Sequence, residues 1–294
     1  MGSPPFLCLT SFLPWLVLPF IRIERIFVEE DKWFMSVRLI SLASGSSGNC
    51  YFVGTPEYGI LIDAGIGSRT IKKRLKEYGI DMSRILAVLV THDHYDHVKS
   101  VAVLGEVYHL PIYSTEKVHL GISFNKKVTE KLSPANMRVI ENGVPFEIKE
   151  MKITSFPLPH DAKDNSGYVI EVGDKTLTIA TDLGNATSEL RAYIANSDYL
   201  ILESNYDEDM LTNGSYPEVL KRRILGSNGH LSNADAAQLL SESATDKLKQ
   251  VCLCHLSKEN NHPNLAVETV SSQLKTKTKV VALPRNEAYC LDLI

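Results

Sequence analysis

The sequence has few cysteines, no excess of positive charge, and no proline- or serine-rich linker between residues 35 and 294. Five cysteines, an odd number, do not suggest a disulfide framework, so we expect a reducing compartment. Thirty-one basic residues against 35 acidic ones give a net charge of -4, which excludes a global positive field but leaves room for a local basic patch. At 294 residues and 44% hydrophobic, the chain is long enough for a buried core and too apolar for general disorder.

The first 34 residues differ from the rest. They are apolar, but Pro14 and Pro19 interrupt them, and the first cation, Arg22, follows the apolar run instead of preceding it as in a secretory signal. We therefore predict that Met35 is the native start, that residues 1–34 are not part of the fold, and that the protein is cytoplasmic without stable membrane association. A membrane-associating hydrophobic leader is the alternative.

From Val37 onward, short apolar runs alternate with turn signals. The pattern predicts strands over 37–42, 50–53, 60–63, 86–91, 112–114, 146–150, 152–156, 168–172, 176–180, 198–203, 250–254 and 279–283. Helices are predicted over 68–78, 98–107, 187–195, 216–225, 233–243 and 265–275, whereas 121–137 has no clear pattern. Because strand–helix alternation recurs in each half, we predict one α/β domain over residues 35–294, a sandwich with sheets inside and helices outside.

The strongest chemical signal directly follows the apolar run at 86–91. The segment Thr91-His92-Asp93-His94-Tyr95-Asp96-His97 places three histidines and a usable aspartate within six residues. Because His92 and His94 are two positions apart, an extended backbone directs both imidazoles to one side. Neutral imidazoles and carboxylates that converge in this way are ligands for divalent metal ions. The segment therefore predicts a metal site.

This HxHxDH motif after an apolar strand resembles the metal-binding motif of the metallo-β-lactamase superfamily. The stretches 42–50, 91–97, 229–233 and 255–263 are most similar to the bacterial YycJ (WalJ) family. The resemblance implies a four-layer αββα sandwich with two mixed sheets, and a cytoplasmic phosphodiesterase of the 5′→3′ DNA exonuclease type. It also implies two divalent ions as cofactors, zinc or manganese with iron not excluded, and DNA as substrate, hydrolysed through a metal-bridging hydroxide.

The resemblance implies further ligands, which lie in the expected order at the ends of later strands. The set comprises two groups of three and one bridging residue: His92, His94 and His160; Asp96, His97 and His255; and Asp182. Asp96 would also accept a proton from the attacking water. Asp63, after an early strand, would orient a ligand instead of binding metal.

Two more residues are predicted from a second resemblance. Gly229-His230-Leu231-Ser232 resembles the Gly-His-Ser-Thr element of ribonuclease Z-like phosphodiesterases, so His230 would contact the phosphate as a catalytic residue. Glu203, which ends a strand, is similar to the glutamate that supports that histidine. The alternative is an incidental histidine before the helix at 233–243. The remaining histidines lack such placement and are predicted to be structural or surface residues: His109, His119 and His262.

Other motifs have weaker meanings. The Gly/Ser loop at 45–49 could hold a phosphate, which predicts substrate contacts by Ser46, Ser47 and Asn49, although a hairpin connection is the commoner meaning. The basic runs at 72–76 and 221–223 are either phosphate contacts or solvated helix faces. Cys252 and Cys254 alternate within an apolar strand and are predicted to lie in the core.

Alternative functions share part of this pattern. A glyoxalase II-like thioesterase has the same ligand series, and a hydrolase of small cyclic phosphodiesters would ignore polynucleotides. A tRNA 3′-processing enzyme would need a long Gly/Pro-rich insertion, which the sequence lacks. A non-catalytic, metal-stabilised DNA-binding module would bind without turnover, and the complete ligand series together with His230 argues against it.

Overall fold

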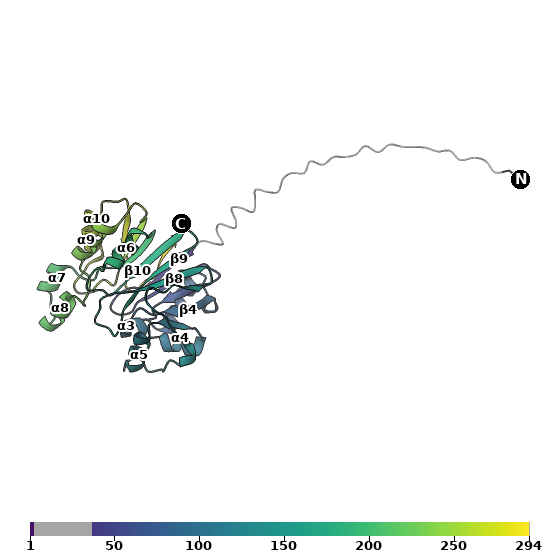
Figure 1. Ribbon diagram of the computed structural model, residues 1–294, viewed down its shortest axis with the longest axis horizontal. Coiled ribbons are helices and arrows are strands. Elements are labelled where there is room, and N and C mark those ends of the chain that lie inside the picture. The colour runs from purple at the N-terminus through teal and green to yellow at the C-terminus, as the bar shows by residue number, and fades with distance from the viewer. Residues whose placement is uncertain (3–36, 294) are drawn as a thin grey trace. The chain divides into compact units, whose positions relative to one another are not determined.

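The computed structural model describes residues 1–2 and 37–293. The predicted leader, its first two residues apart, and the predicted start at Met35 lie outside the described residues. Within 37–293, the strands form two seven-stranded sheets with helices on their outer faces (Figure 1). The predicted α/β sandwich with two mixed sheets is confirmed.

The first sheet has the strand order β14-β1-β2-β3-β4-β5-β6. Its neighbours are antiparallel from β14 to β3 and parallel from β3 to β6. Its strands are β1 (Val37–Ala43), β2 (Cys50–Gly54), β3 (Gly59–Ile62), β4 (Ile85–Leu89), β5 (Ile112–Ser114), β6 (Met137–Val139) and β14 (Tyr289–Leu293).

The second sheet has the order β13-β12-β11-β10-β9-β8-β7. It is antiparallel from β7 to β10 and parallel from β10 to β13. Its strands are β7 (Phe146–Ile148), β8 (Met151–Pro157), β9 (Ser166–Val172), β10 (Lys175–Ala180), β11 (Tyr199–Glu203), β12 (Gln250–Cys254) and β13 (Lys279–Ala282).

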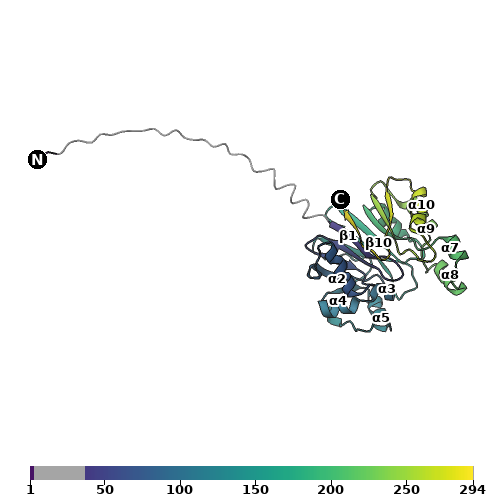
Figure 2. The same cartoon turned by 180° about the vertical axis from the view of Figure 1, so that it is seen from behind.

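The helices form the two outer layers, seen from both sides in Figures 1 and 2. Those that pack on the first sheet, through one shared apolar cluster, are α2 (Ser68–Glu77), α3 (Tyr95–Val98), α4 (Val101–Tyr108) and α5 (Glu116–Phe124). Those on the second sheet are α6 (Ser188–Ala195), α9 (Asn233–Ser243) and α10 (Pro263–Gln273). Beside them lie α7 (Glu208–Asn213) and α8 (Glu218–Leu225), which pack around a separate small cluster. Within the described residues, no helix combines the length and the apolarity needed to cross a membrane.

Alternation along the strands explains the layers. In β3, Ile60 and Ile62 point between the two sheets, whereas Leu61 points to the helices. In β11, Ile201 points between the sheets and Leu200 points to the helices of the second sheet. Successive side chains of a strand face opposite sides, so a strand that is apolar at every position must be covered on both faces. Cys252 and Cys254 are buried in the layer between the sheets.

Several elements differ from the sequence-based expectation. The strand β14 follows the one predicted to finish the chain, and it pairs with β1 across most of the sequence. The predicted helix 98–107 is two helices, because Ser100 leaves the helical conformation and its N–H donates to the Ala64 carbonyl at 2.8 Å. The helices α5 and α7 and the strand β6 were not predicted, since each is short and lacks a clear apolar period.

Candidate active site

The site lies where strands of both sheets end. Asp63 follows β3, the segment 92–97 follows β4, and His160 comes shortly after β8. In the second sheet, the carboxyl ends of β10, β11 and β12 provide the remaining side chains: Asp182, Glu203 and His255. Because the neighbouring strands β10, β11 and β12 are parallel, they end at the same edge of their sheet, which brings residues far apart in the chain together.

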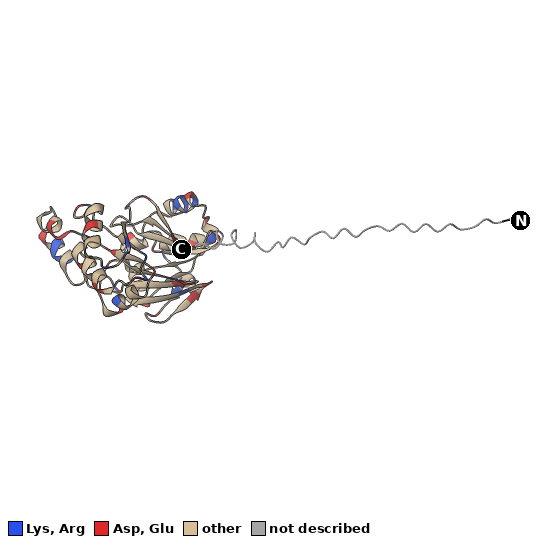
Figure 3. Cartoon of the chain, turned by 90° about the horizontal axis from the view of Figure 1, so that it is seen from above, with Lys and Arg blue, Asp and Glu red and all other residues tan. Residues whose placement is uncertain are grey.

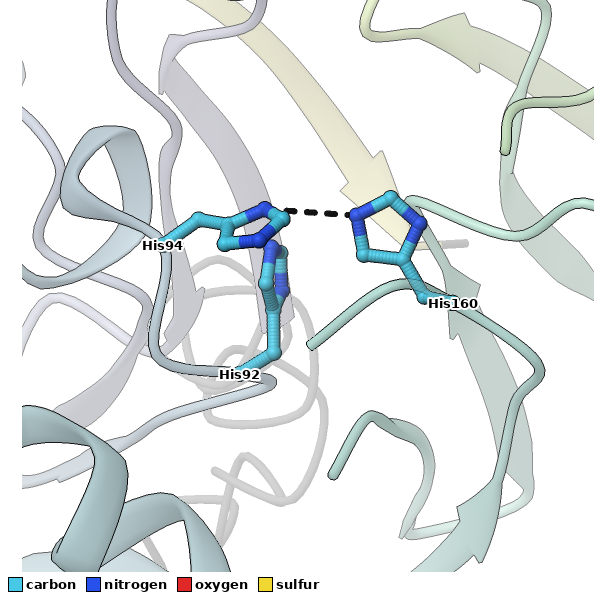
Figure 4. A group of neighbouring side chains, drawn as sticks. All are labelled: His92, His94 and His160. Atoms are coloured by element: carbon cyan, nitrogen blue, oxygen red, sulfur yellow. Dashed lines mark hydrogen bonds between the residues drawn. The ribbon is translucent and has the colours of Figure 1, made fainter. Parts of the chain in front are cut away.

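Three histidines form the first group, and their rings face one another in Figure 4. His94 Nδ1 and His160 Nε2 are 3.3 Å apart, and the centres of the His92 and His94 rings are 4.7 Å apart. Backbone and hydroxyl contacts fix the other ring nitrogens: His160 Nδ1 donates to the Gly229 carbonyl at 2.9 Å, and His92 Nδ1 lies 3.0 Å from the Thr91 hydroxyl. The Nε2 atoms of His92 and His160 are therefore left to point into the group.

The second group consists of Asp96, His97 and His255. Nε2 of His97 lies 3.7 Å from Asp96 Oδ2, and Nε2 of His255 lies 3.6 Å from the same oxygen. These three candidate ligand atoms come from both sheets, because His97 lies in α3, which follows β4 of the first sheet, and His255 follows β12 of the second.

Asp182 lies between the two groups. Its Oδ2 is 3.2 Å from His97 Nε2, and its Oδ1 is 4.0 Å from His160 Nε2. A hydrogen bond from the Thr181 hydroxyl, 2.7 Å long, also contacts Oδ2. One carboxylate thus reaches both sets of ligands, the arrangement that a bridging ligand requires.

Two buried carboxylates, Asp63 and Glu203, hold histidines of the site in place through their Nδ1 atoms. Asp63 accepts a hydrogen bond of 2.7 Å from His97 Nδ1, which fits the orienting role predicted for it. Thr91, which was not predicted, donates to Asp63 through its backbone N–H at 2.8 Å and contacts His92 through its hydroxyl. Its position directly before the motif is the only sequence signal that could have identified it.

Glu203 supports more than was predicted. Its Oε1 lies 2.8 Å from Nδ1 of His230 and 2.8 Å from Nδ1 of His255. Its Oε2 accepts the backbone N–H groups of Leu183 and Leu231, each at 3.0 Å. One buried carboxylate therefore fixes a histidine of the second group and the histidine predicted to contact the phosphate.

The charges of the site call for a cation. Four carboxylates surround the histidines. Asp63, Asp182 and Glu203 are fully or almost fully buried, whereas Asp96 is partly exposed. Burial lowers the pKa of His92 well below its usual range. Burial also acts to lower the pKa of His255, but Asp182, Asp96 and Glu203 outweigh it and raise that pKa to about 10. Where carboxylates cluster in this way, either protonated imidazoles or metal ions must balance the charge.

The unused ligand atoms fit a metal. Nε2 of His92 and Nε2 of His255 are buried, and neither has a hydrogen-bond partner among the described residues. A buried polar atom without a partner is unfavourable by about 1–3 kcal/mol, so two of them in one site indicate that a ligand completes it. Imidazole nitrogens with carboxylate oxygens are a donor set for zinc, manganese or iron.

The backbone at the site is unusual. Asp63, Asp182 and His255 have φ angles of 60°, 56° and 53°. Residues other than glycine rarely adopt this left-handed conformation, which is found preferentially at functional sites. Asp63 and His255 directly follow β3 and β12, and Asp182 lies two residues after the end of β10, so the conformation turns each side chain toward the site.

A cavity of about 240 Å³ opens beside these residues. His230, Asp96 and Ser46 line it, together with Leu220 and Arg223 of α8 and with Tyr216, which precedes that helix. Of the three residues predicted to bind substrate, all of which the structure describes, only Ser46 lines this cavity. Ser47 is exposed nearby in sequence. Asn49 does not fit the prediction: it is fully buried, hydrogen-bonds to both backbone groups of Gly45, and lies 2.9 Å from His97 Nε2.

The basic runs and the remaining histidines likewise differ in whether they lie at the site. Arg223 of the run 221–223 lines the cavity, whereas Lys72 and Lys73 are exposed on α2 and line none of the described cavities. His262 caps α10 by accepting a hydrogen bond from the N–H of Asn264. His109 ends α4, and His119 lies buried in α5, both away from the ligand groups.

Comparison with known proteins agrees with this geometry. A family model described as a β-lactamase superfamily domain matches residues 58–256. The exodeoxyribonuclease YycJ of Bacillus anthracis is 33% identical over 243 residues, covering 83% of this chain and 91% of the relative. The exodeoxyribonuclease WalJ of Streptococcus pneumoniae is 35% identical over 233 residues, covering 79% and 86%.

This chain belongs to the YycJ/WalJ family of the metallo-β-lactamase superfamily. The family expected from the HxHxDH motif is thereby confirmed. Solved structures show the same fold at low identity: YhfI of Bacillus subtilis has a TM-score of 0.64 at 17% identity, covering 87% of this chain and all of that one. Zn²⁺-bound PqqB of Methylobacterium extorquens has a TM-score of 0.65 at 19% identity, with the same coverage.

Proposed function

We propose that this protein is a dinuclear metal-dependent phosphodiesterase that degrades DNA from its 5′ end. The observation that carries the proposal is the pair of ligand groups that share Asp182 and contain two buried, unpartnered imidazole nitrogens. The names of the relatives, both exodeoxyribonucleases, support DNA as the substrate. We also propose the cytoplasm as its location, on the basis of the cysteine content, which favours a reducing compartment, and of the family resemblance.

The residues that would hold the metals follow from the two groups. His92, His94 and His160 would bind one ion; Asp96, His97 and His255 would bind the other, and Asp182 would contact both. The four site carboxylates carry four negative charges, which two divalent ions would balance. When bound, such a pair of ions lowers the pKa of water and offsets the charge of the phosphate during displacement.

The protein's own groups would handle the protons. Asp96 lines the cavity, and His97 outweighs the effect of burial to hold the pKa of Asp96 below its usual range. Asp96 is thus ionised and can accept a proton from the attacking water. His230 also lines the cavity, and Glu203 outweighs burial to raise its pKa. Since Glu203 occupies Nδ1, the proton on Nε2 is available for a phosphate oxygen or the leaving oxygen.

Parallel assays test this proposal. The full-length protein is offered 5′-phosphorylated duplex DNA, bis-p-nitrophenyl phosphate, a cyclic phosphodiester and a glyoxalase II-type thioester. We expect hydrolysis of the first two, abolished by a chelator and by His94→Ala or Asp182→Ala with the fold retained by circular dichroism. Hydrolysis of the thioester alone, or near-normal chelator-sensitive turnover in either variant, would contradict the proposal.

A further inference from the structure

A second cavity continues from the active site and extends to Tyr95, Asn125, Lys126 and Lys127, which have no role in the proposed catalytic site. It has a volume of about 420 Å³ and is lined by His94, Tyr95, Asp96, Asn125, Lys126, Lys127 and Arg223. His94, Asp96 and Arg223 also line the active-site cavity, so the two spaces adjoin along these residues. We name the part formed by Tyr95, Asn125, Lys126, Lys127 and Arg223 the basic groove.

The charge of the basic groove is local. Acidic and basic residues are interspersed over the part of the chain coloured in Figure 3, in keeping with the net charge of -4. In the groove, by contrast, three cations from two separate segments, the turn after α5 and the helix α8, face one cavity: Lys126, Lys127 and Arg223. Asp96, a proposed metal ligand, is the one acidic residue among those that line this cavity, so cations predominate in the groove and would concentrate a ligand of negative charge.

The fold holds the lysine-bearing turn against the metal-binding segment. The side-chain amide of Asn125 donates a 2.8 Å hydrogen bond to the carbonyl of Asp93. One helical face of α5 also lies directly on Asp93, because a Cβ added to Gly121 would come within 2.2 Å of its carboxylate. The position of Lys126 and Lys127 relative to the active site is therefore fixed by contacts with the motif itself.

Arg223 joins the groove to the active site. Its guanidinium pairs with Asp161, with Nη2 at 3.1 Å from Oδ1, and Asp161 lies 3.8 Å from His94. A guanidinium has five N–H donors, and this pair uses two. The others are available to a phosphate oxygen next to the reacting one, and fork-like donation is the geometry that suits phosphate.

An aromatic ring lies among the lysines. The Nζ atom of Lys127 is 5.7 Å from the centre of the Tyr95 ring, and Tyr95 is half-buried. Proteins that bind nucleic-acid strands combine a positive groove for the backbone with aromatic rings on which bases stack. The groove has both parts, whereas a small diester fits within the active-site cavity and needs neither.

We propose that the basic groove binds the DNA strand beyond the reacting phosphate, with Lys126 and Lys127 neutralising backbone phosphates and Arg223 contacting the phosphate next to the reacting one. The inference rests on the proposed function, because the groove extends the same site. It makes the groove the part of the protein that distinguishes a polynucleotide from a small phosphodiester.

The test compares Lys126→Ala/Lys127→Ala with Lys72→Ala/Lys73→Ala, a control pair that is equally exposed on α2. Binding of the full-length proteins to a labelled 5′-phosphorylated duplex with hydrolysis-resistant phosphorothioate linkages is measured by fluorescence anisotropy over a range of salt concentrations. We expect weaker binding for the groove variant and a salt dependence, log K against log salt, shallower by about 1.8, since each lost phosphate contact removes about 0.9. Hydrolysis of bis-p-nitrophenyl phosphate should be unchanged.

Equal affinity and salt dependence in the groove variant and the wild type would overturn the proposal, as would an equal loss in the control pair. Absence of DNA binding by the wild-type protein would overturn it as well. Binding is measured without turnover. A wild-type protein that binds DNA but hydrolyses neither DNA nor bis-p-nitrophenyl phosphate would therefore contradict the proposed function, whereas the anisotropy measurements on the variants would still test whether the groove binds DNA.

Discussion

Replacing Glu203 with glutamine should weaken metal binding although Glu203 belongs to neither group of three proposed ligands. Its Oε2 accepts hydrogen bonds from two backbone N–H groups at 3.0 Å, and a backbone N–H can only donate. In Glu203→Gln, the amide oxygen must therefore take the position of Oε2, so the amide nitrogen faces Nδ1 of His230 and His255. Two N–H donors cannot pair, which shifts the imidazole protons to Nε2.

A protonated Nε2 on His255 cannot bind a metal. Loss of an outer partner of this kind weakens metal affinity by about 10- to 100-fold, or about 1.4 to 2.8 kcal/mol. Isothermal titration of the metal-depleted full-length protein with Zn²⁺ or Mn²⁺ measures this directly, and a urea unfolding curve checks that the variant folds. Glu147→Gln, on the exposed side of β7, is the matched control and should bind as the wild type does. Wild-type affinity in Glu203→Gln would refute the reasoning about the proton positions.

Two further predictions concern the neighbours of these ligands. His230→Ala should retain its metal content by elemental analysis but lose about 10²- to 10⁴-fold in turnover of bis-p-nitrophenyl phosphate, the range typical of a lost proton donor, and loss of metal would show that His230 is a ligand instead. Gly65→Ala should disrupt the metal site, because its Cβ would lie 1.6 Å from the Asp96 carbonyl oxygen, whereas a Cβ at Gly67 would meet the Thr70 hydroxyl oxygen at 3.8 Å, an ordinary van der Waals contact, so Gly67→Ala should be tolerated. Equal metal content in the two glycine variants would contradict this account of the packing.

The sequence predicted the parts of the site that depend on local spacing. The segment 92–97 carries its signal within six residues, and His160, Asp182 and His255 could be found because each closely follows an apolar strand. Their meeting in space could be expected only through the family resemblance, since it depends on how strands of two sheets end at one edge.

Other features depend on contacts that spacing does not reveal. Asn49 was predicted to face substrate because its loop is rich in glycine and serine, but its amide turns inward to Gly45 and His97. The turn that carries Lys126 and Lys127 lies in the segment without a readable pattern, and its contacts with Asp93, through Asn125 and Gly121, place it beside the site. The left-handed backbone of His255 likewise has no signal in the residue type.

The fold likewise contains elements that local sequence patterns predict and elements that they do not. The helix predicted over 68–78 is found as α2, and Gly79, which has a φ of 76°, follows its end. The strand β14 pairs with β1 at the other end of the described domain, so no local pattern defines its partner. The strands that the sequence alone missed, β6 and β14, are short elements stabilised by pairing with strands far away in the chain.

The central claim is that two groups of ligands, joined by Asp182, hold two metal ions in one chain. Metal content of the purified full-length protein, measured by inductively coupled plasma mass spectrometry alongside its hydrolysis of bis-p-nitrophenyl phosphate, tests it most directly. The account predicts two divalent ions per chain, with loss of activity when a chelator removes them and recovery when they are restored. A protein that hydrolyses the diester with no bound metal, and is indifferent to the chelator, would contradict it.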